Sequence, residues 1–150
     1  MKTIKEILFQ ECQNFVDLKY ETINKTIGEL QKSLNSETKS SAGDKHETGR
    51  AMVQLEREKA GEQLAKIQQL NQVLSKVNIS NSSDTIALGS LVYTSNLNYF
   101  IAISTGELSV NDETFYAISA NTPIGQLLLG RQVGDKITFR TESFEIIEVI

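Results

Sequence analysis

Residues 118–137, ISANTPIGQLLLGRQVGDKI, carry the strongest local signals in this 150-residue chain. Pro123 is the one proline of the sequence and separates an apolar run from a short apolar segment. Proline favours the first turn of a helix, and glycine favours its end, where Gly130 stands. The residues Val133, Gly134 and Asp135 then form a turn signal before the next apolar run. The stretch therefore predicts a strand, a short helix over 123–129 and a further strand.

Around this stretch, short runs rich in β-branched and aromatic residues indicate a sheet. The predicted strands cover 86–93, 99–104, 115–119, 137–140 and 144–149, with turns at 95–98, 105–106 and 110–113. Alternation of apolar and polar residues in the last run favours an antiparallel strand with one buried face. We expect residues 84–150 to form a small antiparallel sheet domain with one helix packed against it.

The N-terminal half has the spacing of two long amphipathic helices. The first stripe lies within 3–35 and consists of Ile4, Ile7, Leu8, Phe15, Leu18, Ile23, Ile27, Leu30 and Leu34. Small polar residues at 36–43 predict a turn, and the second stripe is Met52, Leu55, Ala60, Leu64, Ile67, Leu70, Leu74 and Val77. Because each stripe needs a partner, we expect residues 1–78 to form an antiparallel coiled-coil hairpin about 50 Å long. The predicted fold class is α+β.

Charge and composition exclude several kinds of function. The net charge of −4 is unevenly distributed, since residues 80–150 contain three Lys/Arg against eight Asp/Glu. An acidic sheet domain argues against sequence-specific DNA binding and favours a protein partner with a basic surface. No apolar run approaches the length of about 20 residues that crosses a bilayer, so no membrane is expected. The lone Cys12 fits a reducing cytoplasm, and its place near apolar residues in a helical pattern predicts a buried small side chain. The chain has no phosphate-binding glycine loop, and no serine or cysteine nucleophile has a histidine placed for it.

The segment 118–135 resembles the Gre family of bacterial transcript-cleavage factors. That family carries a segment like I-S-x-N-[ST]-P-I-G-x-x-L-[LI]-G-[KR]-x-x-G-D, which this chain follows almost position by position. Residues 144–150 also resemble the last strand of the family. A long coiled-coil hairpin precedes this domain in the family, as it is expected to do here. The resemblance is strong over 86–150 and weaker, in design more than in letters, over 1–80.

The resemblance implies a domain of the FK506-binding-protein-like (FKBP-like) fold that docks beside the secondary channel of RNA polymerase. The docking surface would include Asn121, Thr122, Pro123 and Ile124. The hairpin would enter the channel, where its tip helps hold a second Mg²⁺ in the active site of the polymerase, and water then cleaves the backtracked RNA. The factor would not be an enzyme itself but would stimulate the RNA cleavage activity of the polymerase. It would have no cofactor of its own and would act as a cytoplasmic monomer.

The hairpin tip reads GDKHETGRA over 43–51, where the family has a segment like GDLSENAEY. Asp44 and Glu47 are retained, and the resemblance implies that they are the catalytic, Mg²⁺-binding carboxylates within the polymerase complex. From spacing alone, an acid at a helix start and another three positions later also make a simple helix cap. His46 lies between them and is expected to be an exposed tip residue, because side chains two positions apart diverge on a helix.

Two other functions remain open at this stage. The altered tip is compatible with a non-cleaving regulator that occupies the same channel and modulates transcription. The hairpin is also compatible with a structural adaptor that pairs with another helix. Nascent RNA near the tip is a further candidate partner, through the distal basic residues Lys25, Lys32, Lys39, Lys45, Arg50 and Arg57.

Overall fold

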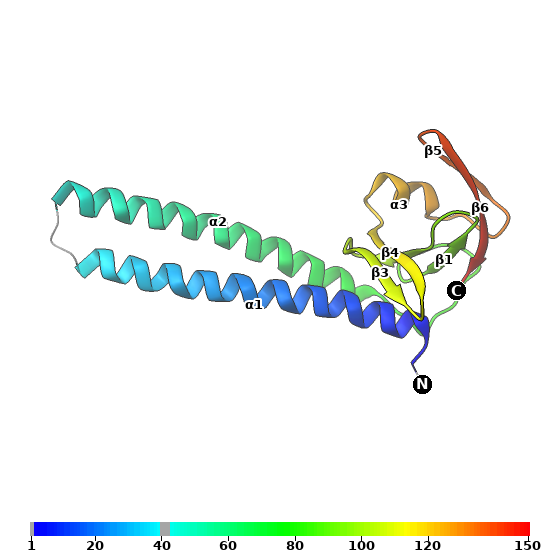
Figure 1. The fold of residues 1–150 in the computed structure, drawn as a ribbon, viewed down its shortest axis with the longest axis horizontal. Helices are drawn as coiled ribbons and strands as arrows, with labels where there is room; N and C mark the ends of the chain where they lie inside the picture. Colours follow the sequence, from blue (N-terminus) through cyan, green and yellow to red (C-terminus); the bar gives the residue numbers. More distant parts are fainter. Residues whose placement is uncertain (1, 40–42) are drawn as a thin grey trace. The chain divides into compact units, whose positions relative to one another are not determined.

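The computed structural model describes the backbone of residues 2–39 and 43–150, and the side chains of residues 2–36 and 48–150. Two long helices, α1 (Ile4–Lys39) and α2 (Gly43–Lys76), precede a six-stranded sheet and a short helix, α3 (Pro123–Leu128). The predicted α+β class, with a helical hairpin before a sheet domain, is confirmed (Figure 1). The part of the predicted 36–43 turn at residues 40–42 lies outside the described residues.

Helix α1 starts at a reciprocal cap that the sequence encodes as Thr3 followed by Glu6. The backbone N–H of Glu6 donates to Oγ1 of Thr3 over 3.1 Å, and the Glu6 carboxylate accepts from the Thr3 N–H over 3.4 Å. This arrangement satisfies two N–H groups that the first helical turn leaves without a partner. The helix continues to Lys39, four residues beyond the predicted end at residue 35.

Contacts divide the chain into two compact units. The first unit consists of Met1–Phe15 with Gln72–Ile150, and the second consists of Val16–Asn71. The first unit therefore contains the whole sheet and also the beginning of α1 and the end of α2. The predicted domain limits, 1–78 and 84–150, separate the helices from the sheet, whereas the two units group residues by their contacts.

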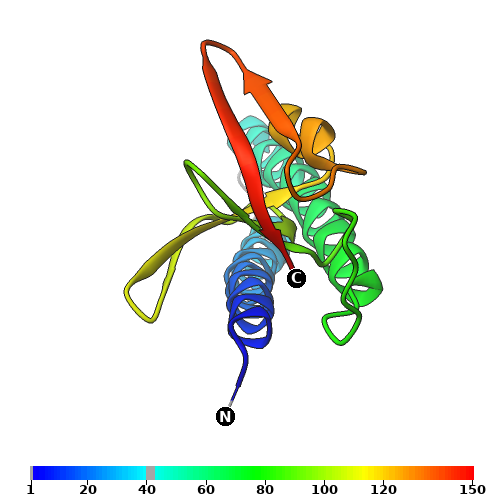
Figure 2. The same ribbon diagram turned by 90° about the vertical axis from the view of Figure 1, so that its right-hand side faces the viewer.

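The sheet of the first unit has the strand order β3-β4-β2-β1-β6-β5 (Figures 1 and 2). Its strands are β1 (Leu91–Thr94), β2 (Tyr99–Ala102), β3 (Gly106–Val110), β4 (Glu113–Ser119), β5 (Lys136–Phe139) and β6 (Glu142–Val149). Neighbouring strands are antiparallel except β2 and β4, which pair in parallel with Tyr99 opposite Tyr116. The sheet is thus mostly antiparallel, and one parallel pair was not predicted.

Two further details of the sheet differ from the sequence prediction. Strand β3 was not predicted, because its sequence GELSV is polar and its first four residues are exposed or half-buried. Strand β1 starts at Leu91 and not at residue 86. Gly89 interrupts this segment with a φ of +93°, a conformation that side chains other than glycine rarely adopt.

The first unit buries large side chains on both faces of its sheet. One cluster includes Ile101, Leu128, Ile137, Phe144 and Ile146, and half-buried residues of α3 pack against it. All four residues of β2 are buried, as expected for a strand covered on both faces. Further fully buried residues come from the helices and from the strands of this unit: Leu8, Cys12, Leu74, Leu91, Phe100 and Phe115. The predicted burial of Cys12 is confirmed.

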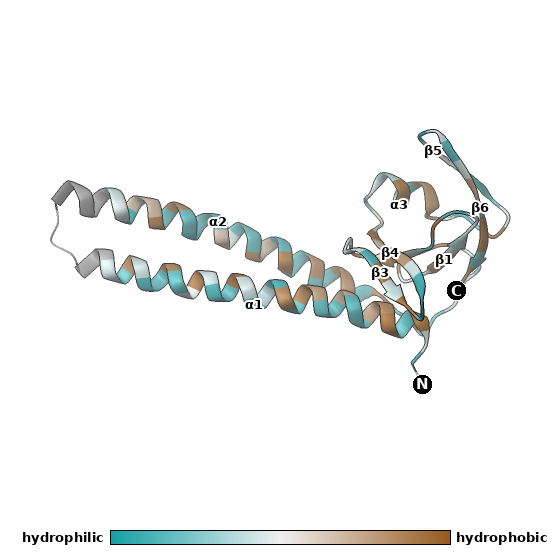
Figure 3. Cartoon of the chain, viewed as in Figure 1, coloured by the Kyte–Doolittle hydropathy of each residue, from teal (hydrophilic) through white to brown (hydrophobic). Residues whose placement is uncertain are grey.

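The second unit is a two-helix seam with fewer buried residues. Its buried hydrophobic side chains are Val16, Ile23, Leu34, Ala60 and Ile67. Three residues of the predicted stripes are wrong as seam positions, since Leu18, Met52 and Leu55 are 65%, 66% and 52% exposed. In α1 the buried line passes through Cys12, Val16 and Ile23, which leaves Leu18 on an outer face. Hydrophobic and hydrophilic residues alternate along both long helices in Figure 3. Of the helices described, none has the length and apolar content that a membrane span requires.

Candidate functional site

The predicted tip carboxylates lie where α2 begins. The helix starts at Gly43, so Asp44 and Glu47 belong to its first turns. Their side chains, and that of His46, lie outside the part of the chain whose side chains are described. The catalytic and Mg²⁺-binding roles of Asp44 and Glu47 therefore stay predictions.

The predicted docking turn is described in full, and Thr122 organises it. Oγ1 of Thr122 donates to the carbonyl of Ser119 over 2.7 Å and accepts from the backbone N–H of Gly125 over 3.0 Å. Thr122 is thus the N-cap of α3, and Pro123 occupies the first helical position, where its missing N–H costs nothing. The local sequence Thr-Pro-x-Gly therefore fixes where the helix starts.

Gly125 lets the turn fold back on the end of β4. A Cβ at this position would lie 2.4 Å from the Ser119 carbonyl oxygen and 2.8 Å from Oγ1 of Thr122. Contacts this short do not occur between real atoms of these types, so any side chain here would push the cap apart. The glycine is required by close approach of the backbone and not by an unusual φ.

Two residues that sequence reasoning missed complete the turn. Ser119 accepts the Asn121 N–H through its side-chain oxygen over 3.2 Å, and Nε2 of Gln126 donates to the Asn121 carbonyl over 3.1 Å. Two hydrogen bonds therefore fix the main chain of Asn121, while the residue as a whole is exposed to solvent. The signal that could have found Ser119 is its place just before the proline turn, where short polar side chains often bond to nearby backbone groups.

The four predicted docking residues differ in what they offer to a partner. Asn121 and Pro123 are exposed, whereas Thr122 and Ile124 are half-buried. Ile124 packs against the hydrophobic cluster of the sheet, and Thr122 is occupied as the cap. The structure also places exposed apolar residues just after α3, at Leu129 and Val133, which are 38% and 55% exposed. Sequence reasoning assigned neither of these to a surface.

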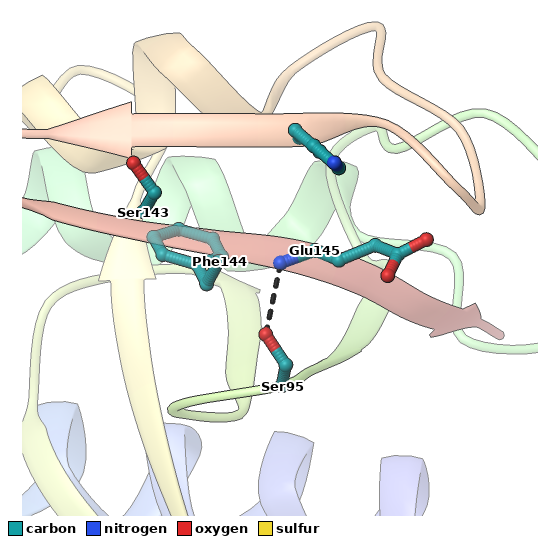
Figure 4. A pocket seen from close by; sticks show the side chains of 5 residues that line it. Ser95, Ser143, Phe144 and Glu145 are labelled. Carbon is teal, nitrogen blue, oxygen red and sulfur yellow. Dashed lines mark hydrogen bonds between the residues drawn. The ribbon is translucent and has the colours of Figure 1, made fainter.

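A shallow hollow of about 260 Å³ lies between the β1–β2 turn and the β5–β6 hairpin (Figure 4). It is lined by Ser95, Lys136, Ser143, Phe144 and Glu145. Both hydroxyls are engaged: Oγ of Ser95 accepts the Glu145 N–H over 2.9 Å, and Oγ of Ser143 shares a 3.0 Å hydrogen bond with Oγ1 of Thr138. The described residues that line the hollow include no histidine, so they do not form the serine–histidine pair of a nucleophilic hydrolase.

The ionisable groups of the sheet domain show the influence of burial. Burial raises the pKa of Tyr93, and the nearby carboxylates of Glu113 and Glu148 raise it further. The Tyr93 ring packs edge-on against Phe115 at a centroid distance of 5.9 Å. Phe100 is fully buried and Tyr99 is 7% exposed. These aromatic rings are therefore core or rim residues of the sheet and not stacking platforms for bases. In the stretches 2–36 and 48–150, no group of three or more His, Cys, Asp or Glu residues is arranged to hold a metal ion.

The fold and the capped turn together define a class of protein: a long helical hairpin followed by a mostly antiparallel sheet domain that presents a Thr-Pro turn. The chain is similar in sequence, over most of its length, to several transcription elongation factors. It is 28% identical to transcription elongation factor GreA of Thermotoga maritima, with 87% of this chain and 92% of that protein covered. It is 29% identical to transcription elongation factor GreA of Thermotoga petrophila, with 83% of this chain and 85% of that protein covered.

A scan against models of known protein families gives no match. The similarity to GreA proteins covers 83–87% of this chain, and it agrees with the resemblance of segment 118–135 to the Gre family.

Proposed function

We propose that this chain is a Gre-like transcription elongation factor that binds RNA polymerase and stimulates cleavage of backtracked RNA. In this proposal the sheet domain, residues 84–150, docks on the polymerase, and the hairpin, residues 1–78, enters its secondary channel. The observation that carries the proposal is similarity to GreA elongation factors over 87% of the chain, which includes both the hairpin and the sheet domain.

The docking step would use the turn at the start of α3. Asn121 and Pro123 are exposed there, and their positions are fixed by the Thr122 cap and the Gln126 hydrogen bond. A surface that is rigid before binding loses little conformational entropy on association, which favours affinity. Leu129 and Val133 add exposed apolar area close along the chain.

The cleavage step would use Asp44 and Glu47. These residues are three positions apart at the start of α2, and such residues are neighbours on a helix surface. Carboxylate oxygens are preferred ligands of Mg²⁺, and two-metal hydrolysis of a phosphodiester needs the second ion to be retained. The role of this chain would be to supply those oxygens to a Mg²⁺ in the active site of RNA polymerase, which performs the reaction. The factor itself would hold no cofactor.

A cleavage assay on a purified backtracked elongation complex tests this role. The chain with its own sequence should shorten the RNA, while Asp44→Ala and Glu47→Ala should each lower the cleavage rate by at least tenfold. Glu62→Ala, which removes an exposed acid from the same helix, is the matched control and should keep the rate. Equal rates for all four proteins would remove the assigned role from the two tip acids.

A binding measurement tests the docking surface separately from the chemistry. Asn121→Ala removes an exposed side chain whose main chain holds the turn, so the fold should persist while affinity for RNA polymerase falls. Thr114→Ala changes another exposed polar residue, on β4, and should bind as the unaltered chain does. Unchanged affinity of the Asn121 variant would exclude this residue from the docking surface.

The altered tip sequence favours a second candidate function. Lys45 stands between the two acids, and a positive charge there partly offsets their attraction for Mg²⁺. A factor with such a tip would occupy the channel and modulate transcription without cleavage. RNA polymerase binding together with inhibited synthesis, and no shortening of the RNA, would favour this alternative.

A further inference from the structure

Lys5 is buried in a place that is unfavourable for a lysine. It is 5% exposed, and lysines are almost never fully buried unless they are paired. It is also the second residue of α1, where the positive end of the helix dipole disfavours a cation. Both effects destabilise a charged lysine here, so a compensating interaction is needed to explain its position.

The structure supplies one such interaction. Nζ of Lys5 donates a hydrogen bond to the backbone carbonyl of Asn81 over 3.1 Å, across a separation of 76 residues. Within the described part of the chain, Lys5 has no carboxylate within ion-pair distance, and burial alone lowers its pKa. A hydrogen bond from a charged donor in a shielded environment is stronger than one between neutral groups.

The acceptor belongs to the segment that joins α2 to the sheet. This linker, residues 77–84, has no regular secondary structure and is exposed at most of its positions. Its other hydrogen bonds are local: the N–H of Val77 bonds to Leu74, and the N–H and hydroxyl of Ser80 bond to Oδ1 of Asn78. Among the hydrogen bonds of the described residues, the one from Lys5 connects the middle of the linker to a helix that is remote in sequence.

We propose that Lys5 is a positioning residue that clasps the linker 77–84 to the first turn of α1. The clasp fixes the path of the chain as it leaves α2 and enters the sheet, inside the compact unit that contains both segments. It explains why a cation is retained in a buried first helical turn. It does not depend on the function proposed above.

Backbone ¹⁵N relaxation of residues 79–83 tests the clasp in the full chain. Lys5→Met keeps the length and the apolar stem of the side chain while it removes the donor. We expect order parameters of the linker to fall from the rigid range, about 0.85, to below about 0.6 in this variant. Lys2→Met removes the same charge from an exposed neighbour and should leave the linker rigid.

Two more variants separate the hydrogen bond from general packing. Asn81→Ala keeps the main-chain acceptor, so the linker should stay rigid. Lys5→Arg keeps a charged donor and should retain more order than Lys5→Met. The proposal is overturned if Lys5→Met and Lys2→Met give the same linker order parameters, or if Arg and Met at position 5 loosen the linker equally. Loss of order in β2 together with the linker would also overturn it, because Lys5 would then support the whole unit.

Discussion

The two compact units of the chain are built on different principles. The first, which contains the sheet, buries whole aromatic and aliphatic side chains on both faces, including Phe100 and Phe115 at 0% exposure. The second, Val16–Asn71, buries one line of mostly small or medium side chains and leaves Met52 and Leu55 more than half exposed. Stability scales with the apolar area removed from water, so the first unit should resist unfolding more strongly.

The difference suggests how the chain divides its tasks. A unit packed on both faces of a sheet holds a surface turn in one geometry, as the Thr122 cap requires. A two-helix seam with a weak core opens locally at lower free energy. The proposed docking surface lies on the first kind of structure, and the proposed tip residues lie in the middle of the sequence of the second unit, where α2 begins. Changes that act differently on the two units can break or sharpen this contrast.

The largest expected effect is the removal of a core aromatic ring from the first unit. Phe115→Ala should lower the free energy of unfolding by about 3–5 kcal/mol, because a fully buried ring leaves a cavity. Urea unfolding followed by tyrosine fluorescence measures it, since the chain has no tryptophan and Tyr93, Tyr99 and Tyr116 all lie in this unit.

The matched change in the second unit is Leu70→Ala, at a half-buried position of α2. It should cost about 1–2 kcal/mol, because a half-exposed leucine gains only part of its burial energy. Urea unfolding followed by far-ultraviolet circular dichroism, which reports the long helices, measures this loss of stability. Equal losses for the two variants would mean that the helical seam is packed as tightly as the sheet domain, and the contrast would fail.

The sequence predicted elements whose signals are local. Pro123 and Gly130 marked α3 to within a residue, and the spacing of three and four marked both long helices. It missed features that depend on distant partners. The parallel pairing of β2 with β4 joins strands that another strand separates in sequence, and edge strand β3 needs no apolar face.

The candidate docking site shows the same contrast between local signals, which the sequence reveals, and packing against distant residues, which it does not. The turn 121–124 followed from its residues and from the family resemblance, while the packing of Ile124 into the sheet cluster required the folded structure. Leu18 was placed in the helical seam because it follows Phe15 by three positions in the apolar stripe, yet Val16 and Cys12 are the buried residues. Spacing alone therefore misplaced part of the register. The burial of Lys5 could not be predicted, because lysines are mostly exposed.

A glycine-to-alanine change should have opposite effects in the two units. Gly125→Ala should destabilise the first unit by about 1–3 kcal/mol, because the new Cβ would clash with backbone atoms that can move only if the turn is distorted. Gly61→Ala lies inside α2 with nothing within 4 Å of its Cβ, so it should stabilise the second unit by about 0.5–1 kcal/mol.

Thermal unfolding of both alanine variants, followed by tyrosine fluorescence and by circular dichroism, shows whether each substitution raises or lowers stability. The crowding at Gly125 also bears on the proposed docking to RNA polymerase: Gly125→Ala displaces the Thr122 cap and should weaken that proposed binding. Stabilisation by alanine at both positions would contradict the close approach of Gly125 to Ser119.

The smallest expected effect concerns the Cys12 thiol at the base of α1. Burial raises the pKa of Cys12 from its ordinary value of 9.0 to about 12. The folded chain therefore keeps the thiol protonated where the unfolded chain loses the proton. This contribution to stability is fully present below pH 9 and is lost as the pH rises toward 12. Between pH 8 and 10 the loss should be about 1 kcal/mol.

Cys12→Ala should remove that part of the pH dependence. The tyrosines with raised pKa values titrate alike in both proteins, so their contribution cancels in the difference between them. Urea unfolding of both proteins at pH 8, 9 and 10 measures this loss. Parallel pH profiles for the two proteins would show that the thiol reaches water without unfolding of the first unit, which would weaken the contrast between the two units.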